Sequence, residues 1–278
     1  MRAAVVRSFE NPPRYEEFTT PRPTEGQVLV DMLATGLHPQ VRSGANGTHY
    51  TSDGRLPLIP GVDGVGRLPD GRRVYFVADD GAPGTMAEQA LLDPRRSVPL
   101  PDDADPVTIA AAMNPAMSSW VALRRRTEFR PGRSILVLGA TGNAGRMAVQ
   151  IARHLGADRI VAAGRDPKRL ALLTDLGATD VVSLAGDPAQ SADKLAEAAA
   201  DVDVVIDYTW GLRPNGPSPP CSAAGPIAAL HWTGFRSAPW PGRTSLCLPP
   251  SSAPPICGSW AAGRAPSPPP GSSPNCRP

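Results

Sequence analysis

The stretch that decides the fold is Leu138-Gly139-Ala140-Thr141-Gly142-Asn143-Ala144-Gly145, a glycine-rich turn between two apolar segments. The segment before it, Ser134–Leu138, is short and apolar after its first residue, which is typical of a buried strand. The segment after it runs to His154 with the apolar spacing of an amphipathic helix. A glycine-rich turn between a strand and a helix predicts a site where the helix N-terminus binds phosphate groups.

Two glycines of this turn have separate expected roles. Gly142 would let the backbone approach the pyrophosphate of a dinucleotide, and Gly145 would let the helix pack closely on the strand. A tight turn that binds no ligand is the alternative, but the complete strand–turn–helix context favours the dinucleotide. The residues expected to contact the cofactor here are Gly139, Ala140, Thr141, Gly142, Asn143, Ala144 and Gly145.

The end of the next expected strand, Arg159–Ala163, favours NADP(H) over NAD(H). Enzymes that use NAD place an acidic residue about 20 residues after the turn, where it binds the ribose hydroxyls. Gly164 stands at this place, and the cations that follow, which can face a 2′-phosphate, are Arg165, Lys168 and Arg169. Asp166 argues against NADP(H), but its place before Pro167 is that of a helix N-cap.

Strands and helices alternate through the second half of the chain. The expected strands are Ser134–Leu138, Arg159–Ala163, Asp180–Ser183 and Asp203–Asp207. The expected helices are the one that ends at His154, Pro167–Leu176 and Ala189–Ala199. This alternation implies α/β architecture with a parallel sheet and right-handed crossovers, of which residues 113–210 hold the first half.

The first part of the chain shows short expected strands separated by turns instead of alternating strands and helices. Its expected strands are Ala3–Val6, Gln27–Leu33, Arg73–Val77 and Ala87–Leu92, separated by turn signals such as Asn11-Pro12-Pro13. This spacing predicts a small, irregular β-barrel over residues 1–112. A helix is expected over Pro106–Arg125, with Asp102 or Asp105 near its start.

Overall composition excludes several classes of function. The formal net charge of +2 gives no reason to expect a nucleic acid or a membrane surface as a partner. Met1–Ser8 lacks a signal-peptide core, and no apolar run reaches the length of a membrane span. We therefore expect a cytoplasmic protein.

The last part of the sequence, residues 211–278, has another composition. It contains no Asp, Glu or Lys, and it holds all four cysteines and about half of the 34 prolines. Because such a Pro/Ser-rich sequence is poorly suited to strands or helix interiors, we expect a disordered tail without further strands. Back-translating this part with GC-rich codons and reading the result two bases out of phase restores a helix and two strands, which indicates a frameshift near Trp210-Gly211 and a truncated second domain.

The order of these motifs resembles the medium-chain dehydrogenase/reductase superfamily, particularly its zinc-free, quinone-oxidoreductase-like branch. The form Ala140-x-Gly142-x-x-Gly145 is similar to that branch's fingerprint. The other matching segments are Gly26-Gln27-Val28-Leu29-Val30, Ala34-Thr35-Gly36-Leu37-His38, Pro60-Gly61-Val62-Asp63-Gly64-Val65-Gly66 and Arg130-Pro131-Gly132-Arg133-Ser134. Over residues 1–210 the resemblance implies a GroES-like β-barrel domain beside a Rossmann domain, with the active site in the cleft.

The resemblance also implies that there is no catalytic zinc. In the zinc-dependent relatives the first ligand, a cysteine, falls near His38, the ligand histidine falls at Val62, and the third, a cysteine, falls at Asn114. Only His38 could bind a metal, whereas a catalytic zinc needs three protein ligands. His38 is equally well read as a core histidine.

The activity implied by the resemblance is hydride transfer from NADPH to a small quinone, enone or aldehyde. The candidate catalytic residues are Tyr50, as proton donor or carbonyl partner, and Asn46, although Tyr50 is as easily a packing residue at the domain edge. Asn46 and Asn114 are expected to hydrogen-bond the substrate or the nicotinamide, and Ser118 aligns with a hydroxyl that contacts the nicotinamide. The alternatives are an inactive truncated remnant and a non-catalytic NADPH-binding protein. Relatives often form homodimers through their last Rossmann strand, a dimer that we expect this chain to lose.

Overall fold

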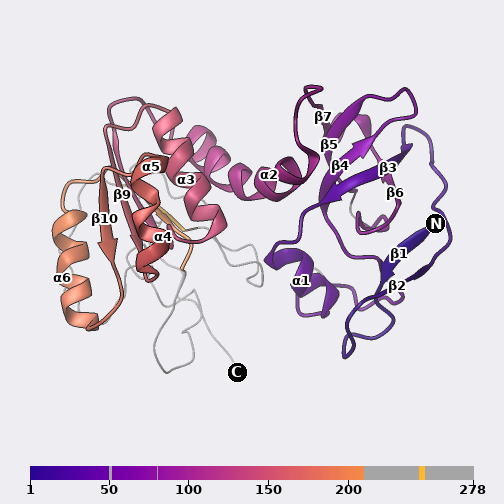
Figure 1. The fold of residues 1–278 in the computed structure, drawn as a ribbon, viewed down its shortest axis with the longest axis horizontal. Coiled ribbons are helices and arrows are strands. Elements are labelled where there is room, and N and C mark those ends of the chain that lie inside the picture. The colour runs from indigo at the N-terminus through magenta and orange to yellow at the C-terminus, as the bar shows by residue number, and fades with distance from the viewer. Residues whose placement is uncertain (50–51, 80, 210–243, 248–278) are drawn as a thin grey trace, which may run out of the picture.

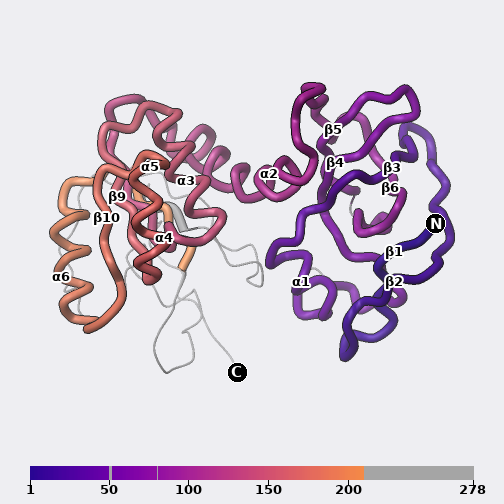
Figure 2. Tube along the Cα trace, in the orientation of Figure 1, coloured from indigo at the N-terminus to yellow at the C-terminus, as the bar shows by residue number. Residues whose placement is uncertain are grey.

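The computed structural model describes residues 1–49, 52–79 and 81–209 and the backbone of 244–247, arranged as two lobes (Figure 1). The Cα trace passes from the N-terminal to the C-terminal lobe through one helix, α2 (Pro106–Val121), which continues as the π-helical turn η2 (Ala122–Arg126; Figure 2). The helix begins after Asp105, whose side chain accepts a hydrogen bond from the Thr108 backbone. The expected helix over Pro106–Arg125 is therefore confirmed. The predicted domain boundary after residue 112 falls inside α2 and stays a prediction.

The N-terminal lobe is built from antiparallel strands. Its elements are β1 (Arg2–Val5), β2 (Arg14–Glu17), β3 (Val28–Thr35), α1 (Pro39–Ala45), β4 (Asp63–Arg67), β5 (Arg73–Val77), β6 (Gln89–Leu92), the 3-10 helix η1 (Pro94–Arg96) and β7 (Ser97–Pro99). Five strands form a sheet in the order β6-β3-β4-β5-β7, and β1 pairs with β2. All four strands expected in this region are present.

Strand β4 was not expected, because its sequence Asp63-Gly64-Val65-Gly66-Arg67 contains residues that are rare in strands. The structure explains the glycines. A Cβ at Gly64 would lie 2.5 Å from the Ala34 carbonyl oxygen, and one at Gly66 would lie 2.9 Å from Val30 Cγ2. The strand lies so close to β3 that neither position has room for a side chain.

The C-terminal lobe is a doubly wound α/β unit. Its elements are β8 (Ser134–Leu138), α3 (Asn143–His154), β9 (Arg159–Gly164), α4 (Pro167–Ala171), α5 (Leu173–Leu176), β10 (Asp180–Ser183), α6 (Pro188–Ala198), β11 (Val204–Asp207) and β12 (Thr244–Cys247). All strands pair in parallel in the order β10-β9-β8-β11-β12. The expected fold class, a β-barrel-like domain plus a Rossmann domain, is confirmed.

Residues of the central strand β8 alternate between two apolar cores. Ile135 and Val137 pack in the cluster that contains residues of α3, whereas Leu136 and Leu138 pack in the cluster that contains Leu195 of α6. Helices therefore cover both faces of the sheet, which buries its strands as a parallel sheet requires. The connecting turns lie at the carboxyl ends of the strands, which is where ligands of such sheets bind.

Strand β12 corrects the expectation that no strand follows Gly211. Thr244–Cys247 pairs with β11 in a register that runs from Val204–Thr244 to Asp207–Cys247. These residues lie in a proline-free window between Pro241 and Pro249, and pairing satisfies backbone groups that the edge of β11 would otherwise expose. The rest of the tail lies outside the described residues, so its expected disorder and frameshift stay predictions. Among the helices that the structure describes, none combines the length and apolarity needed to cross a membrane.

Candidate functional site

The glycine turn connects β8 to α3 at the carboxyl end of the sheet. Gly139 has φ +75°, a conformation that residues with a side chain rarely adopt. A Cβ at Gly145 would overlap the Gly139 carbonyl oxygen and lie 2.6 Å from Ala140 Cα, so α3 packs directly on the turn. Gly142 is different, because it is exposed and a Cβ there would meet only the Gly139 oxygen, at 3.4 Å. The expected close packing at Gly145 is present, and the side of the turn at Gly142 is open to a ligand.

The N-terminus of α3 keeps its backbone donors available. Gly142 is its N-cap, with no side-chain cap, and no acidic residue stands in the first turn. The first N–H groups of a helix lack partners within it and carry the positive end of its dipole. The side-chain amide of Asn143 donates to the Ala111 carbonyl oxygen at 3.1 Å, which fixes α3 against α2. This end of α3 can therefore bind the pyrophosphate of a dinucleotide.

The end of β9 has no room for an acidic residue. A Cβ at Gly164 would lie 2.6 Å from Thr141 Cγ2, because β9 ends against the glycine turn. Asp166 caps α4 by accepting from the Arg169 backbone N–H at 3.1 Å, which confirms its expected role, and it also pairs with Arg169 Nε at 3.4 Å. Arg165 and Lys168 are exposed and have no ion-pair partner within the described part of the chain. These two cations are thus available to a 2′-phosphate.

Two hydroxyl groups meet beside the glycine turn, one of them expected from the sequence. Ser118 Oγ on α2 donates to the Pro115 carbonyl oxygen at 2.7 Å and lies 3.0 Å from the Tyr208 hydroxyl. Either hydroxyl can be the donor between the two, because the single Ser118 proton can point to Pro115 or to Tyr208. Burial raises the pKa of Tyr208 against the opposing effect of its bonds to Ser118 and Ser119. Tyr208 follows β11 directly, and a Cβ at Gly139 would lie 3.3 Å from Tyr208 Cβ.

Tyr208 was missed by the sequence reasoning. The available signal was its position, because it is the first residue after a strand whose carboxyl end lies beside the glycine turn.

Replacing Tyr208 with phenylalanine removes only its hydroxyl. We expect the free energy of unfolding to fall by about 1 kcal/mol, the net contribution of one hydrogen bond in a partly buried place. Ser118→Ala is the matched control, and a double-mutant cycle by urea denaturation isolates the coupling. Strictly additive effects of the two substitutions would contradict a bond between these hydroxyls.

The remaining predicted site residues lie on the N-terminal lobe and on α2. Asn114 is half-buried on α2 one turn before Ser118, so both lie on one face of that helix. Asn46 is exposed at the C-terminal end of α1. Tyr50 lies outside the described residues, so its expected role stays a prediction.

A buried polar cluster in the N-terminal lobe surrounds Asp63, which the sequence reasoning did not single out. The Asp63 side chain is 0% exposed; its Oδ1 lies 3.2 Å from His38 Nε2, and its Oδ2 accepts from the Tyr75 hydroxyl at 2.7 Å. Burial, followed by donation to Asp63 and the nearby negative charge, raises the pKa of Tyr75 above its ordinary value. The hydroxyls of Thr35 and Thr85 both donate to the Asp63 carbonyl oxygen, at 3.0 and 2.8 Å.

The donor set does not fit a catalytic zinc. Of the three positions that hold the metal in zinc-dependent relatives, Val62 has no donor atom, and the Nε2 of His38 is already bonded to Asp63. Over residues 1–49, 52–79 and 81–209 no cluster of three or more His, Cys, Asp or Glu side chains could hold a metal ion.

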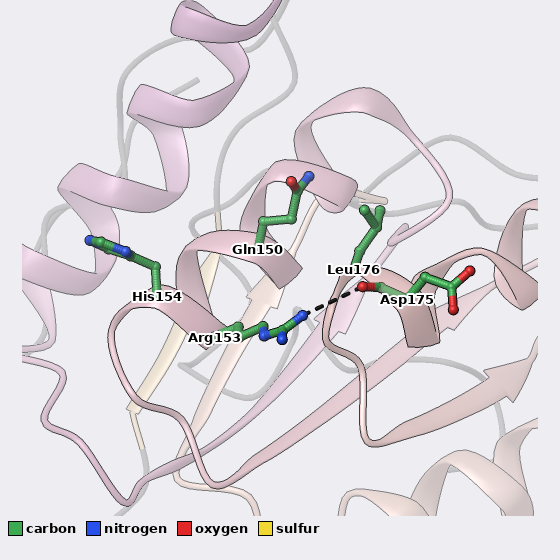
Figure 3. Close-up of a pocket in the computed structure, with 5 residues that line it drawn as sticks. All are labelled: Gln150, Arg153, His154, Asp175 and Leu176. Atoms are coloured by element: carbon green, nitrogen blue, oxygen red, sulfur yellow. Dashed lines mark hydrogen bonds between the residues drawn. The ribbon is translucent and has the colours of Figure 1, made fainter.

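A surface pocket of about 430 Å³ lies elsewhere on the C-terminal lobe (Figure 3). It is lined by Gln150, Arg153, His154, Asp175 and Leu176, and Arg153 donates to the Asp175 carbonyl oxygen at 3.4 Å. These residues come from the C-terminal half of α3 and from α5, whereas phosphates bind at the opposite end of α3. This pocket is therefore not the dinucleotide site.

Comparison with known proteins agrees with this geometry. The family described as zinc-binding dehydrogenase matches residues 144–211. A protein of Emericella nidulans named "Probable NADPH-dependent quinone reductase" is 32% identical over 247 residues, covering 76% of this chain and 68% of that protein. The quinone oxidoreductase of Rattus norvegicus is 32% identical over 225 residues, covering 74% of this chain and 66% of the rat protein.

A solved structure supports the same assignment. The quinone oxidoreductase of Thermus thermophilus, determined alone and in complex with NADPH, matches with a TM-score of 0.66 and 30% identity over 75% of this chain and 67% of that one. The chain belongs to the quinone-oxidoreductase-like branch of the medium-chain dehydrogenase/reductase superfamily, a family of oxidoreductases. It spans about two thirds of the length of these relatives.

Proposed function

We propose that this chain is an NADP(H)-dependent oxidoreductase that reduces a small quinone or an enone. The observation that carries the proposal is the glycine turn, open at Gly142, with the exposed Arg165 and Lys168 at the end of the neighbouring strand. The relatives named for NADPH and the Thermus enzyme solved with NADPH support the same cofactor, as expected from the sequence.

Each part of the cofactor has residues suited to it. The N–H groups at the start of α3 would bind the pyrophosphate, and the cations Arg165, Lys168 and Arg169 would surround the 2′-phosphate. Asn114 and Ser118 on α2 would orient the nicotinamide. When bound, NADPH supplies the hydride, and the chain's own residues position the acceptor and provide a proton.

We also propose which residues would contact the acceptor. Tyr50 would donate a proton to the acceptor or hydrogen-bond its carbonyl, and Asn46 would contact it. The homodimer of the relatives and a cytoplasmic location stay predictions. A chain that binds NADPH without reducing an acceptor is the alternative function.

Titration of the full chain with NADPH by calorimetry, followed by turnover assays with a simple benzoquinone and a simple enone, tests the proposal. We expect a Kd in the micromolar range or below and oxidation of NADPH that depends on the acceptor. Binding without turnover would favour the non-catalytic alternative, and no binding would refute the proposal. A version with the reading frame restored after Trp210 is assayed in parallel. Activity in that version alone would mean that the tail, and not a wrong assignment of the reaction, causes the loss.

A further inference from the structure

The order of strands in the C-terminal lobe fixes where a dinucleotide crosses the sheet. From β8 the chain continues on one side to β9 and β10, and then returns to place β11 on the other side of β8. Ligands of such sheets bind at the carboxyl ends of the strands where this order reverses. Asp207 at the end of β11 pairs in register with Leu138 at the end of β8, so both strands end at the same level. The crossing point therefore lies between the residues that follow these two strands.

The proposed function gives the cofactor a direction across this point. The cations for the 2′-phosphate follow β9, and the pyrophosphate binds after β8 at the start of α3. Neighbouring strands lie about 4.8 Å apart, and β9, β8 and β11 are consecutive in the sheet. A dinucleotide with its adenosine at β9 and its phosphates at β8 therefore directs its nicotinamide riboside to the end of β11.

Tyr208 and Thr209 stand at that end of β11. The Tyr208 backbone N–H donates to the Leu138 carbonyl oxygen at 3.1 Å. The buried Asp207 accepts from the backbone N–H and the hydroxyl of Thr209, both at 2.7 Å, which fixes the direction of the chain as it leaves the strand. A Cβ at Gly139 would lie 3.1 Å from Thr209 Cγ2 and 3.3 Å from Tyr208 Cβ. Tyr208 thus lies against the first residue of the glycine turn.

Helix α2 fixes the hydroxyl group of Tyr208. The phenolic oxygen lies 3.0 Å from Ser118 Oγ. Seven residues earlier on α2, which is two helical turns, the Ala111 carbonyl oxygen accepts from the Asn143 side chain at the start of α3. One helix therefore contacts both the N-terminus that would bind the phosphates and the residue that follows β11.

We propose that Tyr208 binds the nicotinamide riboside half of NADP(H), with its phenolic hydroxyl as the hydrogen-bond donor and Ser118 as the residue that positions it. The inference rests on the proposed function and names a further binding residue for the same site. The carboxamide and the ribose hydroxyls of that half offer oxygen atoms that accept such a bond.

The pair of hydroxyls is suited to a ligand of this kind. The Ser118 proton can point to Pro115 or to Tyr208. When it points to Tyr208, the phenolic oxygen keeps a partner and its own proton can bond an oxygen of the cofactor. Burial raises the pKa of Tyr208 against the opposing effect of its hydrogen bonds, so the phenol stays protonated and can donate near neutral pH.

Calorimetry of the full chain with two ligands tests the inference. NADPH carries the nicotinamide riboside, whereas adenosine 2′-phosphate 5′-diphosphate keeps the 2′-phosphate and both bridging phosphates but lacks that half. For Tyr208→Phe we expect NADPH affinity to fall about tenfold, the loss of one hydrogen bond, and affinity for the shorter ligand to stay within about twofold of the wild type. A purely structural role of Tyr208 would lower both affinities by the same factor, because both ligands use the glycine turn and α3.

Two further variants calibrate this comparison. Arg165→Glu, on the side of the 2′-phosphate, should lower both affinities by a similar factor, since both ligands carry that phosphate. Tyr15→Phe removes a phenolic hydroxyl from β2 in the other lobe, where it donates to Glu88 at 3.2 Å, and should leave both affinities unchanged.

The outcomes separate the inference from the proposed function. If the wild type binds neither ligand, the proposed function fails and the inference fails with it. If the wild type binds both ligands and Tyr208→Phe keeps full NADPH affinity, or loses affinity for both ligands equally, the inference alone is wrong. A loss confined to NADPH assigns Tyr208 to the nicotinamide half.

Discussion

Replacing Gly145 with alanine should destabilise the C-terminal lobe by about 3 kcal/mol and weaken NADPH binding beyond detection at ordinary concentrations. The added methyl group would overlap the Gly139 carbonyl oxygen and lie 2.6 Å from Ala140 Cα and 2.9 Å from the Gly139 carbonyl carbon. All three atoms belong to the backbone, so no flexible side chain can move aside. Helix α3 would have to shift, although its residues Ala148, Val149 and Ala152 are fixed in the core.

Gly142→Ala is the matched control in the same turn. Its methyl group would meet only the Gly139 oxygen, at 3.4 Å, an ordinary contact. We expect a loss of stability below about 1 kcal/mol, from a poorer N-cap, but weaker NADPH binding because the methyl stands where the pyrophosphate approaches. Urea denaturation measures the first quantity and calorimetry the second. Wild-type stability in Gly145→Ala would show that the turn does not pack against α3 as described.

The strands of the Rossmann lobe up to Asp207 could be predicted to within one residue, because their signals are local, whereas the single helix expected over Pro167–Leu176 is divided into α4 and α5. Strands β8 and β10 have the expected bounds, and Asp166 caps α4 as expected. Apolar periodicity, caps and glycine turns depend only on neighbours in the sequence. Strand β4 could not be predicted in this way, because its glycines serve contacts with β3, about 30 residues earlier.

The same distinction, between local signals and contacts of distant residues, applies to the candidate site. The glycine turn and its cations are contiguous motifs, so they could be singled out as candidates from the sequence. The pair of His38 with Asp63 joins residues 25 positions apart, and that of Ser118 with Tyr208 joins residues 90 positions apart. Only the folded chain brings these groups together, so their hydrogen bonds had no signature in the sequence. Strand β12 was missed for the opposite reason, since a proline-rich composition outweighed a short window that can pair with an available edge.

Reversing the charges of Arg165 and Lys168 to glutamate should lower NADPH affinity about 100-fold or more and leave NADH affinity nearly unchanged. Both side chains are exposed, so the fold should lose less than about 0.5 kcal/mol. Each contact between a cation and a phosphate contributes about 1.5–3 kcal/mol, and two such contacts correspond to at least this factor. Because the attraction is between charges near the surface, wild-type NADPH affinity should also fall with added salt more steeply than NADH affinity.

The control must carry the same change in net charge at a distance from the turn. Arg125 and Arg126 are exposed at the end of η2, which precedes β8, whereas the glycine turn follows β8, a strand whose five residues span about 16 Å. Their replacement by glutamate should leave the ratio of NADPH to NADH affinity within about twofold of the wild type, since charges beyond a Debye length are largely screened. Calorimetry of both variants with both cofactors gives the ratios. Equal losses of NADPH affinity in the two variants would mean that only net charge matters and that Arg165 and Lys168 do not hold the 2′-phosphate. A loss confined to the variant of Arg165 and Lys168 would show that these two residues bind the 2′-phosphate.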